Sequence, residues 1–466
     1  MEQKKRSSFS SRIGFVLAAA GSAVGLGNLW RFPYLAARYG GGIFLLVYLI
    51  LALTFGFSLM ITEIAIGRKT RLSCIGAYKA LDKRFGFLGW LAAFVPFIIT
   101  PYYCVIGGWV MKYLFTFISG NALEAADNGG FFSSFIGYDA GSLSSTIFSL
   151  NGPTPWFILF VLATTIVVIF GVEKGIEKAS RIMMPILAIL AIVIAIYSLT
   201  IPGALQGLKY YILPDFSQFS VSTVLGAMGQ MFYSMSLAMG IMITYGSYMQ
   251  KENLLEHSVT QIEIFDTLFA FVAGLMIIPA VYVFSGTEGM GAGPSLMFIS
   301  LPKVFAAMGR AGTAVGILFF VTAIFATLSS CISVLESITA NCMEIFHTSR
   351  RKTVLVLSVI YLAASAVIAL GYSVFYVEVL LPNGSVGQLL DIMDYVSNSV
   401  MMPFIALLST VLIGWVMTPD YVIDEMERNG ETFRRKKLYC VMIRYVAPVM
   451  MFVLFLQSTG ILSKIG

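Results

Sequence analysis

Apolar stretches long enough to cross a lipid bilayer recur along the whole chain, and no other feature of the sequence restricts its possible folds so strongly. A transmembrane helix needs about 20 mostly apolar residues. Lipid admits neither a lone strand nor an open sheet edge, because their backbone polar groups would lack partners. The sequence therefore predicts an all-α membrane protein. We count about eleven transmembrane helices, over residues 13–35, 42–66, 88–117, 156–171, 182–200, 223–248, 262–285, 313–343, 354–372, 389–416 and 438–461.

Composition and charge agree with lipid as the solvent. Of the 466 residues, 58% are hydrophobic and 12% are charged, about half the charged fraction of a soluble domain. If the N-terminus is cytoplasmic, most Lys and Arg residues fall in inside segments, which is the positive-inside pattern. The net charge of +6 is thus a topological signal and implies no nucleic-acid partner. An odd number of spans then leaves the C-terminus outside.

Residues that could support enzyme chemistry are scarce. His257 and His347 both fall in cytoplasmic segments, so no histidine within the spans could activate a serine nucleophile or bind a metal. The sequence contains neither a metal-ligand cluster nor a phosphate-binding loop in the right context. We expect a protein that is not an enzyme.

Two spans contain segments that should not remain helical, at 21–28 in span 1 and at 233–240 in span 6. Glycine costs helix stability, and serine offers the backbone competing hydrogen bonds. The interruptions lie five spans apart, so the two halves would enter the membrane in opposite orientations. Paired interruptions of this kind indicate a transporter binding site. We expect a single transmembrane domain, 1–466, with a first repeat at about 10–200, a second at about 220–417 and an additional helix at about 438–461.

The segment 21–33, GSAVGLGNLWRFP, closely resembles the first span of the neurotransmitter:sodium symporter family, in particular the bacterial amino-acid transporter branch that includes the bacterial leucine transporter. The resemblance continues through Glu63 in ITEIAIGR and through 101–103, 230–248 and 326–336. It implies a five-plus-five inverted repeat with helices 1 and 6 unwound at mid-membrane, sodium coupling and a central substrate site. It also implies the plasma (inner) membrane of a prokaryote.

Simpler interpretations of the same residues compete with this one. Gly21 and Gly25 fit a small-residue packing motif, but packing leaves Asn28 and Arg31 unexplained inside a span. A channel would need a continuous polar path, whereas the polar residues cluster in the middle of the spans. A transport-inactive receptor relative stays open as an alternative.

The resemblance implies two sodium sites. An unwound segment frees carbonyl oxygens, and hard cations prefer oxygen ligands. One sodium would bind the substrate carboxylate together with Ala23, Asn28, Ser234 and Asp266. The second would bind carbonyls and hydroxyls of Gly21, Val24, Ala326, Ser329 and Ser330.

Asp266 bears on chloride dependence. Some relatives carry asparagine at this position and obtain negative charge from chloride or from a nearby glutamate, but the nearby position here is Ala270. We expect Asp266 to supply that charge itself, so that transport needs no chloride. The alternative is a solvated Asp266 near the cytoplasmic interface, which Gln261 and Glu263 would favour.

Gly25 indicates the class of substrate, because relatives in this family that carry monoamines have an aspartate at this position. Glycine suits a substrate that brings its own carboxylate, and Met239 stands where phenylalanine is expected, giving an adaptable wall. For individual wall residues, ordinary helix packing remains a competing explanation. The resemblance implies a pocket for a hydrophobic or aromatic L-amino acid, formed by Ser22, Ala23, Gly25, Gly27, Ile99, Tyr103, Tyr233, Ser234, Ser236, Met239, Ser330 and Val334.

Charge pairs are expected to gate this pocket. Arg31 and Asp394 would close the outer path, and Arg6 with Glu344, near Tyr248, would close the inner path. Arg6 could instead be a positive-inside anchor.

Two glutamates have other expected roles. Glu63 should hold the unwound backbone of spans 1 and 6 by accepting amide hydrogen bonds, and Glu336, a glutamine in some relatives, is a candidate protonatable counter-transport site.

Together these features predict a sodium-coupled symporter that imports a hydrophobic or aromatic L-amino acid by alternating access. Its cofactors would be sodium ions, two in number by the resemblance, without chloride. Its partners would be the amino acid and the lipid bilayer, and a monomer is compatible with the sequence.

Overall fold

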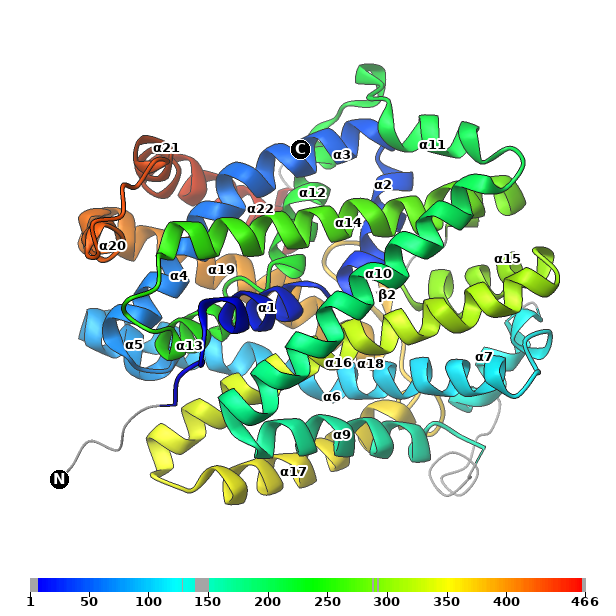
Figure 1. Cartoon of the computed structure of the whole chain (residues 1–466), viewed down its shortest axis with the longest axis horizontal. Coiled ribbons are helices and arrows are strands. Elements are labelled where there is room, and N and C mark those ends of the chain that lie inside the picture. The colour runs from blue at the N-terminus through cyan, green and yellow to red at the C-terminus, as the bar shows by residue number, and fades with distance from the viewer. Residues whose placement is uncertain (1–6, 128, 139–150, 287–288, 291–292, 463–466) are drawn as a thin grey trace.

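The computed structural model describes residues 7–127, 129–138, 151–286, 289–290 and 293–462, and within them the chain is mainly helical (Figure 1). The first half contains α1 (Arg12–Ala23), η1 (Gly27–Arg31), α2 (Phe32–Arg38), α3 (Gly42–Leu51), η2 (Ala52–Gly56), α4 (Phe57–Thr70), α5 (Cys74–Leu81), η3 (Lys83–Phe85), α6 (Gly86–Ile118), η4 (Glu124–Ala126), α7 (Gly130–Ile136), α9 (Thr154–Ile169), η5 (Val172–Glu177), α10 (Lys178–Thr200), α11 (Ala204–Ile212) and η6 (Phe216–Gln218).

The second half is helical apart from one short antiparallel hairpin of β1 and β2. Its elements are α12 (Val221–Ser234), α13 (Ile241–Tyr248), α14 (Leu255–Ser285), η8 (Leu296–Ser300), α15 (Leu301–Ala307), α16 (Arg310–Phe346), α17 (Arg350–Leu370), β1 (Val379–Leu380), β2 (Val386–Gly387), α18 (Leu389–Asp394), η9 (Tyr395–Met401), α19 (Met402–Val411), η10 (Leu412–Val416), α20 (Asp420–Glu427), α21 (Lys436–Val441), η11 (Met442–Val446) and α22 (Ala447–Ser458).

Eight helices of the described chain are long and apolar enough to cross a membrane. A ninth span results if α1 is joined to the helix of η1 and α2, which is bent from it by 51°. Of the two remaining expected spans, α9 is apolar but has only 16 residues, and the span at 223–248 is divided into α12 and α13. The predicted all-helical membrane fold is therefore present, while the count of about eleven stays a prediction.

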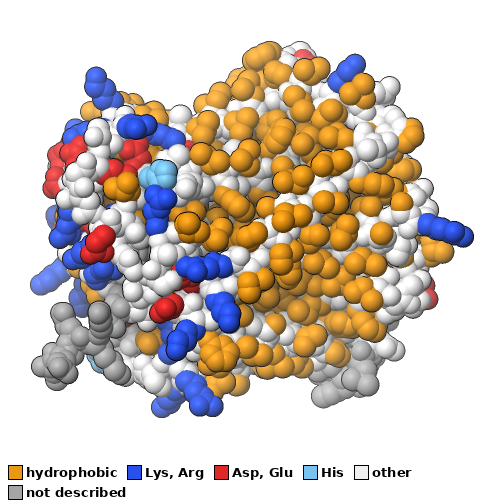
Figure 2. All heavy atoms as spheres, viewed as in Figure 1, with side chains coloured by type: hydrophobic (Ala, Val, Ile, Leu, Met, Phe, Trp, Pro, Cys, Tyr) orange, Lys and Arg blue, Asp and Glu red, His pale blue; other side chains and the backbone are white. Residues whose placement is uncertain are grey.

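The outer surface suits a lipid environment. Figure 2 shows a broad belt of hydrophobic side chains across the face in view, with Lys and Arg gathered at the end where α5, α20 and α21 lie in Figure 1. On α10, Ile182, Ile189 and Ile196 are 54%, 60% and 59% exposed. Residues seven apart share one helix face, so α10 presents an apolar stripe outward.

The first helical run is interrupted after Ala23. Val24 ends α1 with an extended backbone (φ −75°, ψ 104°), and the regular hydrogen-bonded run resumes at Gly27. The carbonyls of the last turn of α1 therefore lack the amides that would follow them in a continuous helix. They are available to side chains or to a ligand.

The second interruption separates α12 from α13 at residues 235–240. Ser236, Ala238 and Gly240 have φ angles of 53°, 59° and 67°. Glycine adopts this left-handed region freely, whereas other residues pay about 1–2 kcal/mol each. Contacts from elsewhere in the fold must therefore hold Ser236 and Ala238 in place.

Two glycines let α4 and α13 approach each other closely. A Cβ atom added at Gly67 would lie 1.8 Å from the Ile243 carbonyl oxygen, and one added at Gly246 would lie 2.3 Å from that of Ile64. Backbone therefore packs against backbone at this crossing, as in other membrane helix pairs that meet through small residues.

This crossing gives a stability prediction. We expect Gly67→Ala to destabilise the protein by about 1–3 kcal/mol, because the methyl group can be accommodated only by moving backbone. Thermal unfolding of the purified protein in detergent measures the effect. Gly86→Ala is the control, since a Cβ there has no neighbour nearer than 3.7 Å, and equal midpoints for the two variants would contradict the prediction.

Candidate functional site

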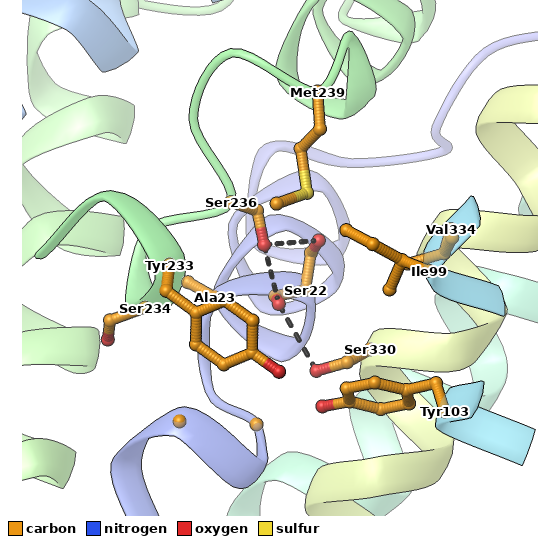
Figure 3. Close-up of a pocket in the computed structure, with 12 residues that line it drawn as sticks. Ser22, Ala23, Ile99, Tyr103, Tyr233, Ser234, Ser236, Met239, Ser330 and Val334 are labelled. Atoms are coloured by element: carbon orange, nitrogen blue, oxygen red, sulfur yellow. Dashed lines mark hydrogen bonds between the residues drawn. The ribbon is translucent and has the colours of Figure 1, made fainter. Parts of the chain in front are cut away.

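A pocket lies where the two helix interruptions meet (Figure 3). Its walls come from α1 and the residues after it, from α6 and α16, and from the end of α12 with the segment that follows. The structure brings together in this one pocket all twelve residues that the sequence resemblance implied for the substrate: Ser22, Ala23, Gly25, Gly27, Ile99, Tyr103, Tyr233, Ser234, Ser236, Met239, Ser330 and Val334.

Serine hydroxyls satisfy the carbonyls that α1 leaves open. The Ser236 hydroxyl donates to the Ser22 carbonyl at 2.9 Å, and the Ser22 hydroxyl donates to Ser236 Oγ at 3.2 Å (Figure 3). The Ser330 hydroxyl lies within 3.4 Å of the carbonyl oxygens of Gly21, Ser22 and Val24. These bonds join α1, α16 and the broken segment around one group of backbone oxygens.

The predicted ligands of the second sodium lie at this same place. The carbonyls of Gly21 and Val24 converge on Ser330 Oγ, at 3.4 and 3.3 Å. Ser329, the residue before Ser330 on α16, donates its hydroxyl to the Ala326 carbonyl at 3.1 Å. All of these carbonyl and hydroxyl oxygens are neutral, and such oxygens are suitable ligands for a sodium ion.

Gly25 and Gly27 lie where neighbouring side chains leave no room for a Cβ atom. A Cβ atom at Gly25 would lie 2.6 Å from Ser330 Oγ and 2.8 Å from the Tyr103 hydroxyl, and one at Gly27 would lie 2.5 Å from the Tyr233 ring. Any side chain at Gly25 would therefore displace pocket atoms.

Backbone amides beside these glycines already have partners. The Gly25 amide donates to Asn28 Oδ1 at 3.2 Å, and the Leu26 amide donates to the Tyr103 hydroxyl at 3.2 Å. These side chains hold the two amides in a fixed orientation. A carboxylate that entered the pocket could replace Asn28 and Tyr103 as the acceptor of the two amide hydrogen bonds.

Asp266 is the centre of a buried polar cluster. Its carboxylate accepts from Asn28 Nδ2 at 3.0 Å, from Ser234 Oγ at 2.8 Å and from the Tyr48 hydroxyl at 3.4 Å. The residue is 0% exposed, so the alternative of a solvated Asp266 at an interface is wrong. Asn28, Ser234 and Asp266, expected as ligands of the first sodium, are in mutual contact.

Tyr48 was not identified from the sequence. It is buried and belongs to α3, which is otherwise strongly apolar. A single hydroxyl within the apolar run 42–53 is the signal that could have found it, because a buried tyrosine hydroxyl needs a hydrogen-bond partner.

Two more side chains hold the interrupted backbone. Glu63 Oε1 accepts from the Ala238 amide at 2.6 Å, which is the expected bond to span 6. It fixes one of the residues with left-handed φ angles. Gln230 Nε2 donates to the Gly27 carbonyl at 2.9 Å, so α12 also anchors the segment after α1.

The expected outer gate pair has separate partners in the described chain. The Arg31 guanidinium lies 5.3 Å from the centre of the Tyr233 ring, as a cation–π contact. Asp394 Oδ1 accepts from the Tyr102 hydroxyl at 3.1 Å and from Asn398 Nδ2 at 2.5 Å. Each charge is thus stabilised locally, and the expected Arg31–Asp394 ion pair is absent from this structure.

The expected inner gate lies only partly within the described residues. Arg6 lies outside the described residues, and Glu344 accepts from the amide and hydroxyl of Ser73, at 2.8 and 2.7 Å, at the start of α5. Tyr248 donates to Glu336 Oε1 at 2.7 Å. Glu344 therefore caps the start of α5, and its expected pairing with Arg6 stays a prediction.

Glu336 forms an ion pair that the sequence analysis missed. Arg350, at the start of α17, donates to its two carboxylate oxygens at 2.5 and 2.8 Å. Glu336 is 0% exposed, and Arg350 is 16% exposed. The pair ties α16 to α17 next to Tyr248, and nothing in the spacing of the two residues could indicate it because they belong to different helices.

A family model and two prokaryotic relatives match nearly the whole chain. The model of the Sodium:neurotransmitter symporter family matches residues 6–126 and 134–465. The uncharacterized sodium-dependent transporter YhdH of Bacillus subtilis is 33% identical over 99% of this chain and 100% of its own length. The uncharacterized sodium-dependent transporter MJ1319 of Methanocaldococcus jannaschii is 31% identical over 100% of this chain and 93% of its own.

A solved structure is also similar. The crystal structure of MhsT in complex with L-phenylalanine matches with a TM-score of 0.85 and 36% identity, covering 97% of this chain and 100% of that one. The described fold is therefore shared with that protein over nearly its whole length.

The contact of Glu63 gives a second prediction. We expect Glu63→Met to destabilise the protein by about 1–3 kcal/mol, because the buried Ala238 amide would lose its acceptor. Glu63→Gln keeps a carbonyl acceptor and should lose clearly less. Thermal unfolding of the two variants tests this, and a Met variant as stable as the Gln variant would contradict the assigned role.

Proposed function

The chain belongs to the Sodium:neurotransmitter symporter family, and from this premise we propose that it imports a hydrophobic or aromatic L-amino acid together with sodium, by alternating access. The observation that carries the proposal is the pocket at the two helix interruptions, where neutral oxygens and the Asp266 cluster lie side by side. Bare carbonyls suit a cation, and oriented amides suit a carboxylate.

We further propose an architecture of eleven spans in a five-plus-five inverted repeat. In it, span 1 consists of α1 with η1 and α2, span 6 consists of α12 and α13, and α21 with α22 forms the additional span. The basic end seen in Figure 2 would be cytoplasmic by the positive-inside rule. The N-terminus would lie inside and the C-terminus outside, in the plasma membrane of a prokaryote.

The pocket supports an amino acid with a large apolar side chain. Ile99, Met239 and Val334 supply apolar wall. L-phenylalanine is the ligand of the similar MhsT structure, and an aromatic or branched side chain is our proposal for this chain.

The amino acid and the first sodium would share one contact. The substrate carboxylate would lie beside the Gly25 and Leu26 amides and would complete the ligands of a sodium held by Ala23, Asn28, Ser234 and Asp266. The second sodium would take Gly21, Val24, Ala326, Ser329 and Ser330. Because binding free energies are coupled reciprocally, sodium should tighten amino-acid binding as much as the amino acid tightens sodium binding.

A thermal-stability screen tests this proposal directly. Purified protein should be stabilised by a few large apolar L-amino acids in sodium and by none in potassium, with a gain of about 2.7 kcal/mol at a ligand concentration of 100 times Kd. Matching polar and D-amino acids serve as controls. The absence of any sodium-linked stabilisation, together with no accumulation by reconstituted vesicles, would refute the function.

Asp266 leads to a separate prediction about chloride. Because its buried carboxylate already supplies a negative charge beside the first sodium site, uptake should be the same in chloride and in gluconate. Asp266→Asn removes that charge and keeps the size, so it should weaken sodium binding by at least tenfold, the equivalent of about 1.4 kcal/mol. Wild-type uptake that collapses in gluconate would overturn the assignment.

A further inference from the structure

Two cysteines face each other where α6 packs against α16. Cys104 Sγ and Cys331 Sγ lie 3.7 Å apart. Both side chains are buried, with exposed fractions of 2% and 0%. Both are free cysteines, so two reduced thiols are in direct contact inside the fold.

The thiol pair adjoins the pocket on both helices. Cys104 follows Tyr103 on α6, and Tyr103 accepts from the Leu26 amide at 3.2 Å. Cys331 follows Ser330 on α16, and Ser330 contacts the open carbonyls of α1. Tyr103 and Ser330 both line the pocket (Figure 3). A change in the spacing of α6 and α16 at the thiols would therefore move groups that hold the first interrupted segment.

The pocket leaves little room for such a movement. A Cβ atom at Gly25 would lie 2.6 Å from Ser330 Oγ and 2.8 Å from the Tyr103 hydroxyl, so the backbone at Gly25 lies directly against both groups. Closely packed groups transmit a displacement, because there is no free volume to absorb it. A shift of either helix at the thiol pair would therefore reach the pocket.

The two sulfur atoms need only a small adjustment to form a bond. Because an S–S bond is about 2.0 Å long, the sulfurs would have to approach each other by about 1.7 Å. Helix α6 can supply part of this movement, since Pro96 and Pro101 lie inside it. A proline removes a backbone hydrogen bond from a helix interior and permits a bend there, and Pro101 lies within one turn of Cys104.

Hydrogen peroxide is an oxidant that suits a buried thiol pair, because it is small and uncharged and pays no charge-burial cost. One sulfur attacks the peroxide, the O–O bond breaks, and a sulfenic acid and one water molecule form. The second thiol then attacks that sulfur. The S–S bond forms, the S–O bond breaks, and the hydroxyl group leaves with the thiol proton as a second water molecule. The two sulfurs lose two electrons, and the two peroxide oxygens gain them.

We propose that Cys104 and Cys331 form a peroxide-sensitive modification site, at which a disulfide between α6 and α16 displaces the adjoining pocket residues and slows uptake until a dithiol reduces it. The effect on uptake rests on the proposed function. Formation of the disulfide does not depend on that function, because it follows from the contact of the two sulfurs alone.

The test measures the disulfide and the uptake of amino acid in the same vesicles. Reconstituted protein is treated with hydrogen peroxide and digested without reduction, and mass spectrometry should find the peptide of Cys104 joined to that of Cys331. Uptake should fall about fivefold, as expected for the loss of one hydrogen bond at the pocket. Dithiothreitol should restore it. The chain also has 24 methionines, but methionine sulfoxide is repaired by dedicated reductases, so a dithiol alone would leave damage at methionine in place.

Two variants locate the effect. The double variant Cys104→Ala with Cys331→Ala cannot form the bond, so peroxide should leave its uptake rate unchanged. Cys342→Ala is the matched control, because it removes a half-buried thiol from the same helix α16, about three turns further along. It should stay as sensitive to peroxide as the wild-type protein.

The outcomes separate this inference from the proposed function. If peroxide yields no joined peptide, or if the joined peptide forms while uptake stays normal, the modification site is overturned and the thiols are a packing contact. An equal loss of uptake in the double variant also overturns it and assigns the sensitivity to other residues. Failure of untreated wild-type protein to couple sodium to uptake overturns the proposed function, whereas the peptide measurement still decides whether the disulfide forms.

Discussion

The absence of water around a membrane helix is the constraint on which this structure depends, because each break in a helix leaves backbone groups that lipid cannot satisfy. The chain breaks two helices and then supplies polar side chains from elsewhere to the exposed groups. Ser330 contacts carbonyls of α1, Glu63 accepts from Ala238, and Gln230 donates to Gly27. The same side chains therefore hold the breaks open and define the pocket between them.

Burial of charge follows the same logic. Asp266 is stable inside the fold because Asn28 and Ser234 donate to it from the two broken segments. Glu336 is stable because Arg350 reaches it from the next helix. One carboxylate therefore has only neutral hydrogen-bond donors around it, whereas the other is paired with a cation. This difference decides which of them can attract a cation without a structural change.

The sequence could predict most of the fold, since apolar runs mark the helices and the Gly-rich segment at 21–28 marks the first break. The family resemblance predicted the twelve residues that line the pocket. It could do so because positions such as Gly25 have no room for a side chain, so few other residues can occupy them. Ion pairs were less predictable. Arg31 contacts the Tyr233 ring, and Asp394 accepts from Tyr102, so the two charges do not pair with each other. The Glu336–Arg350 pair depends on how two helices pack, which the spacing of the residues along the sequence does not indicate.

The close crossing of α4 and α13 has a mechanical consequence. At Gly67 and Gly246 there are no side chains that could change rotamer or slide past one another, so the two helices form one stiff lever. Rotation of α13 must then occur with α4 attached to it. Glu63 of α4 also accepts from the Ala238 amide, so a displacement of the two helices would be transmitted to the segment 235–240, which contributes Ser236 and Met239 to the pocket.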